Sequence, residues 1–161
     1  IFFLLIHNNN KKIIDTLKSR CLTYKINLTF DNSVHITNKL INENILNLLN
    51  IDLINYYNTP GDFVNLIKFS KLNNLNLNEL NLGNFLSLLI NEKYYKKDDF
   101  IKLSIFNFIE LYFLKIFSQS TYKNNVINFY SKFIRKINDT NKFNLDHDSL
   151  FMELKSKILN G

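Results

Sequence analysis

Residues 59–72, TPGDFVNLIKFSKL, contain the clearest local structural signal in the chain. Thr59 is a good N-cap residue, Pro60 suits the first position of a helix, and Asp62 follows at the third position, where an acidic side chain is favourable. The segment therefore predicts a helix that begins at Pro60 and continues to about Lys71. It also indicates the kind of structure expected for most of the chain.

Apolar residues recur at helical spacing in four segments after this helix. The expected helices cover residues 83–95, 99–117, 121–137 and 148–159. Asp98, Ser120 and either Asp146 or Asp148 are their expected caps, and Gly161 can stop the last helix. The leucines between 72 and 82 follow the spacing of one leucine-rich repeat, but a single repeat cannot bury its own face. We therefore interpret residues 72–82 as a connector that packs leucines inward.

The residues before position 37 alternate in period two. Ile26, Leu28 and Phe30 lie on one face of an expected strand, and residues 31–33 supply turn chemistry before a second strand at 34–36. An apolar strand at 2–6 and a helix at 11–23, with Cys21 on its apolar face, would precede this hairpin. From Thr37, an expected N-cap, the pattern is helical again to about residue 57.

The expected fold is therefore α+β and predominantly α-helical, with a small N-terminal β-α-β-β unit followed by about six helices. No Pro/Gly-rich linker divides the 161 residues. We expect one domain over 1–161, in which the helical part, 38–161, packs on the mixed unit, 1–37. The most apolar stretch, 100–117, contains two lysines and a glutamate, so a buried helix is expected there and no transmembrane segment.

The composition reflects the gene as well as the fold. Alanine and tryptophan are absent, glycine and proline are rare, and Asn, Ile, Lys, Phe and Tyr, whose codons are rich in A and T, are abundant. This bias predicts an organellar gene and a mitochondrial protein, in the matrix or on the matrix side of the inner membrane. An AT-rich nuclear genome, a virus and a reduced endosymbiont are the alternatives. Ile1 is either a trimmed terminus or a literally translated ATT-type start.

No motif indicates catalysis, a cofactor or a metal. Cys21 is the only cysteine, so an internal disulfide is excluded, and the three histidines lie far apart in the sequence. Residues 146–148, Asp-His-Asp, are the nearest approach to a ligand cluster and are interpreted as helix capping. The glycines are isolated, so no phosphate-binding loop is formed. We expect a non-enzyme with no catalytic residue, no cofactor and no metal site.

Basic residues are the main functional feature, since the net charge is +6 and the pI about 9.3. Two groups are candidate RNA-binding residues: Lys11, Lys12, Lys18 and Arg20, and Lys132, Arg135 and Lys136. The two arginines are the strongest candidates, because a planar guanidinium suits phosphate. A solvated lysine surface is the alternative interpretation. Tyr56-Tyr57 and Tyr94-Tyr95 are the aromatic pairs expected to be exposed for contact with partners.

These features favour a non-catalytic structural subunit of a large assembly. The leading hypothesis is a mitochondrially encoded mitochondrial ribosomal protein that contacts rRNA and neighbouring protein subunits. The second is a peripheral accessory subunit of a respiratory complex or of ATP synthase, which would bury protein surface and little nucleic acid. The third is a helical protein-interaction module from an AT-rich nuclear or viral genome.

Overall fold

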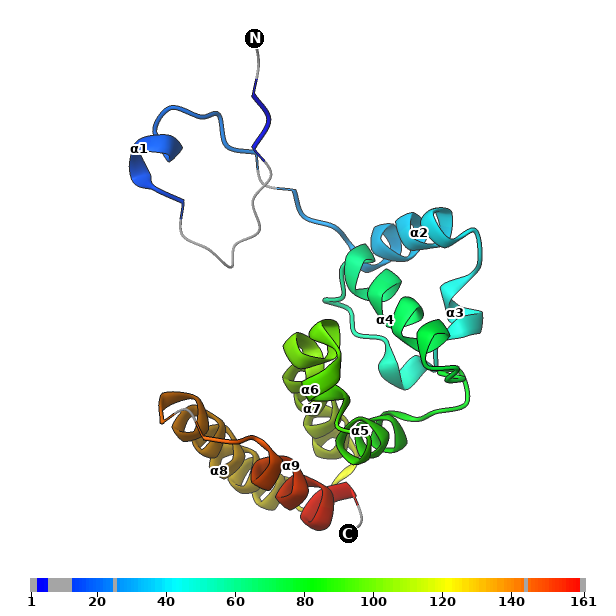
Figure 1. Cartoon of the computed structure of the whole chain (residues 1–161), viewed down its shortest axis with the longest axis vertical. Helices are drawn as coiled ribbons and strands as arrows, with labels where there is room; N and C mark the ends of the chain where they lie inside the picture. The colour runs from blue at the N-terminus through cyan, green and yellow to red at the C-terminus, as the bar shows by residue number, and fades with distance from the viewer. Residues whose placement is uncertain (1–2, 6–12, 25, 144, 160–161) are drawn as a thin grey trace.

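The computed structural model describes residues 3–5, 13–24, 26–143 and 145–159. Helices make up about 69% of the described residues, which contain no strand, so the fold is mainly α-helical. A helical body starts at α2 (Phe30–Ile41), and the short helix α1 (Asp15–Lys18) and its flanking residues lie away from this body (Figure 1).

The expected N-terminal β-α-β-β unit is wrong. The described residues 3–5 and 26–29 have no regular secondary structure, α1 is a single turn, and residues 31–36 lie within α2. The expected turn at 31–33 is the first turn of α2, because the Thr29 side chain caps this helix by accepting the N–H of Asn32 at 3.3 Å. Phe30, Val34 and Ile41 pack against the core, and this helical spacing outweighs the short alternation before it. Of the helix expected at 11–23, the described residues 13–14 and 19–23 are not helical, and residues 2, 6, 11 and 12 of the expected strand and helix lie outside the described residues.

The single helix expected from Thr37 to residue 57 is also wrong. Thr37 is buried inside α2, where its hydroxyl donates to the carbonyl of Ser33 at 2.7 Å. α2 ends at Asn42, which has a left-handed backbone. Two short pieces follow, α3 (Ile45–Leu48) and the 3-10 helix η1 (Ile51–Leu53), and asparagine side chains cap both of them. Each piece buries one apolar residue, so packing and not length stabilises them.

The helix predicted from the stretch at 59–72 is confirmed. α4 spans Pro60–Leu72, and Thr59 and Asp62 form a reciprocal capping box. The Thr59 side chain accepts the N–H of Asp62 at 3.3 Å, and the Asp62 carboxylate accepts the N–H of Thr59 at 2.9 Å. In the connector that follows, Leu77 and Leu82 are buried and Leu72 is exposed, so the connector packs its leucines inward only after α4 has ended.

The helix expected at 83–95 is divided into α5 (Leu82–Asn91) and α6 (Tyr94–Lys97), because Lys93 between them has a left-handed backbone with φ 54°. α7 (Asp99–Gln119) follows, and Asp98 caps it as predicted by accepting the N–H of Ile101 at 2.9 Å. Within the described parts of the chain, no helix combines the length and the apolar character needed to span a bilayer.

One long helix and two short ones complete the body. α8 (Lys123–Lys142) begins and ends later than the expected helix at 121–137, and Ser120, an expected cap, ends α7 while its hydroxyl accepts the N–H of Tyr122. α9 (Asp148–Leu154) continues into the π-helical η2 (Lys155–Leu159), which packs on α5. Figure 1 shows α9 alongside α8.

Phenylalanine rings join these helices into one core. The ring of Phe85 in α5 makes edge-to-face contacts with two other rings. Its centroid lies 6.4 Å from that of Phe69 in α4 and 5.2 Å from that of Phe108 in α7. Phe113 of α7 lies 5.9 Å from the ring of Phe133 of α8. Buried residues from Ile45 to Leu154 belong to a single hydrophobic cluster. Part of the aromatic content is therefore used for packing, where ring pairs add to the stabilisation from buried area.

Asparagine takes over positions that glycine occupies in most proteins. Asn42 and Asn74 have φ of 56° and 52°, whereas none of the described glycines has a positive φ. Among L-residues, asparagine tolerates this left-handed conformation best. A chain poor in glycine can therefore still end its helices sharply.

Candidate nucleic-acid interface

We call residues 1–29 the N-terminal arm; its described parts are 3–5, 13–24 and 26–29. Every described side chain of the arm except the half-buried Ile13 is exposed. The exposed side chains include large apolar ones, with Phe3 at 88%, Leu22 at 86% and Ile26 at 84%. Apolar surface of this extent is typical of a region that a partner covers.

The arm also carries most of the net positive charge of the chain. Residues 1–29 contain five basic residues and one acidic residue, a net charge of +4, whereas residues 30–161 contain 15 and 13, a net charge of +2. Lys18 ends α1 and Arg20 follows it, and both are exposed. The candidates Lys11 and Lys12 lie outside the described residues. A basic and apolar arm can bind phosphates and pack on protein at the same time.

The second candidate group lies on α8, and the structure divides it. Lys132 and Arg135 are exposed. Lys136 points to α9 and pairs with Glu153 at 2.5 Å, and Lys157 pairs with the same carboxylate at 2.8 Å. The two ammonium groups, Lys136 first, lower the pKa of Glu153. Lys136 thus joins α8 to α9, while Lys132 and Arg135 face solvent.

The expected capping role of residues 146–148 is only partly found. Asp146 accepts the N–H of Asp148 at 3.3 Å, just before α9 begins. Asp148 instead receives three side-chain donors from the α6 region: the Tyr95 hydroxyl at 2.6 Å, Lys96 at 2.7 Å and Lys93 at 2.9 Å. This cluster cannot be found from the sequence, because its partners are more than 50 residues apart.

The three donors make Asp148 an anchor between α6 and α9, and they shift the pKa values of the groups involved. Its hydrogen bonds, first with Lys96 and then with Tyr95 and Lys93, hold the pKa of the carboxylate well below its usual range. Burial, followed by the hydrogen bond to Asp148, raises the pKa of the Tyr95 hydroxyl. A carboxylate that stays ionised and accepts three donors ties α6 to α9. The described residues include no group of three or more His, Cys, Asp and Glu side chains that could hold a metal ion.

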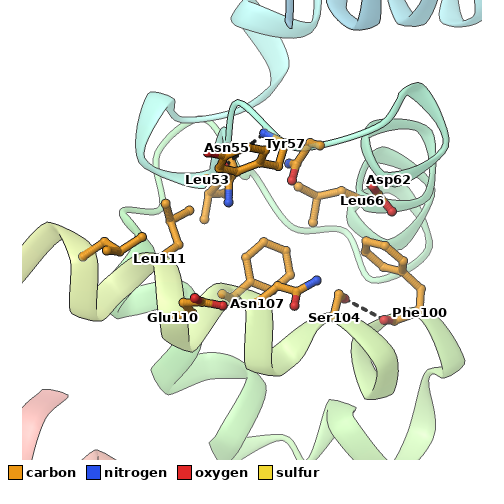
Figure 2. Close-up of a pocket in the computed structure, with 13 residues that line it drawn as sticks. Leu53, Asn55, Tyr57, Asp62, Leu66, Phe100, Ser104, Asn107, Glu110 and Leu111 are labelled. Atoms are coloured by element: carbon orange, nitrogen blue, oxygen red, sulfur yellow. Dashed lines mark hydrogen bonds between the residues drawn. The ribbon is translucent and has the colours of Figure 1, made fainter. Parts of the chain in front are cut away.

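A hollow of about 270 Å³ lies between η1, α4 and α7. Figure 2 shows apolar side chains, such as Leu53 and Leu66, beside polar ones, among them Asn55, Asn107 and Glu110. Ser104 is engaged locally, since its hydroxyl donates to the carbonyl of Phe100 at 2.6 Å. Chemically, these side chains offer hydrogen bonds and a weakly acidic rim around an apolar floor.

The expectations for the tyrosine pairs and for Cys21 have mixed outcomes. Tyr56 and Tyr57 are exposed as predicted, at 77% and 90%. The prediction for the second pair is wrong, because Tyr94 packs on Phe69 at 5.0 Å and Tyr95 is only 7% exposed. Cys21, expected on an apolar helix face, is exposed in the arm. These differences follow from tertiary packing of α6 and from the short length of α1.

Comparison with protein-family models, with curated proteins and with solved structures finds no match to this chain.

Proposed function

We propose that this chain is a non-catalytic structural subunit of a large assembly, and specifically a mitochondrially encoded ribosomal protein that contacts rRNA and neighbouring subunits. One observation carries the proposal: an arm with exposed phenylalanine, leucine, isoleucine and tyrosine side chains and a net charge of +4 extends from a packed helical body. In water such an arm leaves its apolar surface uncovered, and its positive charge attracts a polyanionic partner.

The arm and the body differ in exposure and in charge, and this difference supports the proposed function. The body buries most of its phenylalanines and has a net charge of only +2, whereas the described arm residues, Ile13 excepted, are exposed and the arm has a net charge of +4. RNA attracts the basic residues over a distance that depends on salt, and neighbouring proteins cover the apolar residues. The AT-rich composition supports an organellar gene and thus a mitochondrial location.

The test is sedimentation of a native organellar lysate in a gradient, with the chain followed by mass spectrometry, with and without nuclease. We expect the chain to migrate with ribosomal particles and to leave these fractions after nuclease treatment. The variant K18E/R20E should shift to light fractions. Its matched control is K68E/K102E, which removes the same charge from exposed residues of α4 and α7 and should migrate like the wild type. Migration of K18E/R20E with intact particles would refute the role of the arm.

Solubility provides a second test that needs no organelle. Expressed alone, the chain should be poorly soluble, because its arm exposes apolar surface that belongs in an interface. A soluble, monodisperse monomer would count against any assembly role.

The second candidate function is a peripheral subunit of a respiratory complex or of ATP synthase. The observation that favours it is on the body, where α7 exposes Leu103 and Leu114 next to the hollow lined by Leu53 and Leu66. This surface is suited to protein contact without nucleic acid. Migration with a nuclease-resistant membrane complex would support this candidate and reduce the basic residues to solvated surface.

A further inference from the structure

The outer face of α8 carries a straight stripe of polar side chains. Its members follow one another at alternating steps of four and three residues, and all are exposed: Asn124, Asn128, Ser131, Arg135, Asn138 and Lys142. Five steps over 18 residues average 3.6 residues, the period of an α-helix, so the side chains stay on one side of α8. At a rise of 1.5 Å per residue the stripe is about 27 Å long.

The fold does not use these side chains. Among the described residues, Asn124, Asn128, Ser131, Arg135 and Asn138 have no side-chain hydrogen bond or ion pair, and Lys142 lies over the Phe143 ring at 5.3 Å. The opposite face of α8 does the packing. Phe133 is buried, the ring of Phe129 stacks on that of Phe113 with centroids 6.0 Å apart, and the ring of Tyr130 lies tilted against Phe113 at 5.0 Å. The stripe is therefore available to a partner.

We propose that this stripe, termed the α8 stripe, binds double-helical RNA along its shallow groove. The inference rests on the proposed function, and names the RNA form and the surface that meets it. Amide and hydroxyl side chains both donate and accept hydrogen bonds, as the ribose 2′-hydroxyls of that groove do. Arg135 and Lys142, with Lys132 beside them, supply the charge for the flanking phosphates.

Other partners fit the α8 stripe less well. Single-stranded RNA is bound largely by stacking on successive exposed aromatic rings, whereas the rings of α8 itself face inward and the exposed rings of Tyr122 and Phe143 lie beyond its two ends. A protein partner would need a central apolar anchor, whereas the exposed apolar side chains near the stripe, Ile127 at its border and Phe143 beyond its end, lie away from its centre. A DNA duplex lacks the 2′-hydroxyl. Asp139 is the only carboxylate of α8 and also borders the stripe, and Lys132, Arg135 and Lys142 outweigh it, so this surface keeps a net positive charge.

The test is the affinity of the full chain, kept soluble by fusion to a carrier domain, for an RNA duplex, a DNA duplex of the same sequence and a single-stranded RNA. The decisive variant is N128D/N138D, which keeps the side-chain size and replaces two amides by carboxylates. We expect its affinity for the RNA duplex to fall about tenfold or more, since two hydrogen bonds are replaced by repulsion from phosphates. The matched control N65D/N84D makes the same change at exposed positions of α4 and α5 and should stay within about twofold of the wild type.

Tighter binding of the RNA duplex than of the other two nucleic acids, with loss in N128D/N138D alone, establishes the α8 stripe as the site. Equal loss in N65D/N84D, or unchanged binding in N128D/N138D, overturns it, and preference for single strands or for DNA overturns the assignment to duplex RNA. Circular dichroism of both variants checks that the helices are intact. Sedimentation separates this inference from the proposed function. If N128D/N138D still migrates with ribosomal particles but no longer binds the RNA duplex, the α8 stripe is supported. If the wild-type chain is absent from ribosomal particles, only the proposed function is refuted.

Discussion

Replacement of Asp148 by asparagine should destabilise the fold by about 2 kcal/mol at neutral pH. The largest contribution comes from the Tyr95 hydroxyl, which donates to the carboxylate at 2.6 Å and belongs to a residue that is only 7% exposed. A hydrogen bond to a charged acceptor contributes about 1.5–3 kcal/mol, of which asparagine retains a part. Lys93 and Lys96 are roughly half exposed, so each pair adds no more than about 1 kcal/mol.

The dependence on pH follows from the sign of the shift. In the folded protein the pKa of Asp148 lies below its ordinary value of 3.8, so the folded state stabilises the ionised carboxylate more than the unfolded state does. The stabilisation is therefore complete above about pH 5 and is lost as the pH falls through the unfolded and then the folded pKa. The difference between the wild type and D148N should shrink steadily as the pH falls below about 4.

The assay is urea unfolding followed by helical circular dichroism, from about pH 7 down to about pH 3, on the carrier-fused chain. D139N is the matched control, because Asp139 is exposed on α8 and has no ion pair among the described residues. It should change the free energy of unfolding by less than about 0.5 kcal/mol. The reasoning would be refuted if D148N unfolded like D139N at neutral pH, or if its deficit were unchanged at the lowest pH.

Three further outcomes are expected. Phe133→Ala should lower the free energy of unfolding by about 3–5 kcal/mol, because it empties a buried site between α7 and α8. The exposed control Tyr57→Ser should lower it by less than about 0.5 kcal/mol. Equal effects of the two variants in urea unfolding would place the core elsewhere. Thr59→Ala should cost about 1 kcal/mol by removing the capping box, measured in the same way, and a neutral result would mean that this box does not stabilise α4. Cys21 should react with iodoacetamide without denaturant, as followed by mass spectrometry, since its thiol is exposed; protection until unfolding would contradict its placement in the arm.

Local chemistry decided which elements could be predicted from the sequence. The capping box at Thr59 and Asp62 and the cap at Asp98 involve residues within three positions of one another, and both are confirmed. The segment around Phe30 could not be assigned in this way. Thr29, Asp31 and Asn32 suit a reverse turn and a helix start equally well, and the packing of Phe30 and Val34 on the core selects the helix.

The same limit applies to the candidate site. Lys136 and Lys132 are indistinguishable in the sequence, and only the position of Glu153 on α9 shows that Lys136 is engaged within the fold. The exposure of Tyr95 was predicted wrongly for the same reason, since its burial depends on Phe151 and Asp148 more than 50 residues away. The α8 stripe, in contrast, has a periodicity that is visible in the sequence, but its exposure could be known only from the packing of the opposite face.

The asparagine caps have a consequence for how the protein ages. Spontaneous deamidation converts asparagine to an acidic residue, and at Asn44 and Asn81 the new carboxylate could still accept the backbone N–H groups of Leu46 and Asn84. A negative charge at the start of a helix is favourable, so those two caps would survive the damage. Asn50 differs, because its amide also donates to the carbonyl of Asn78 at 3.0 Å, a bond that a carboxylate cannot make. Deamidation of Asn50 should therefore remove its hydrogen bond to the connector at Asn78, whereas the starts of α3 and α5 should remain capped.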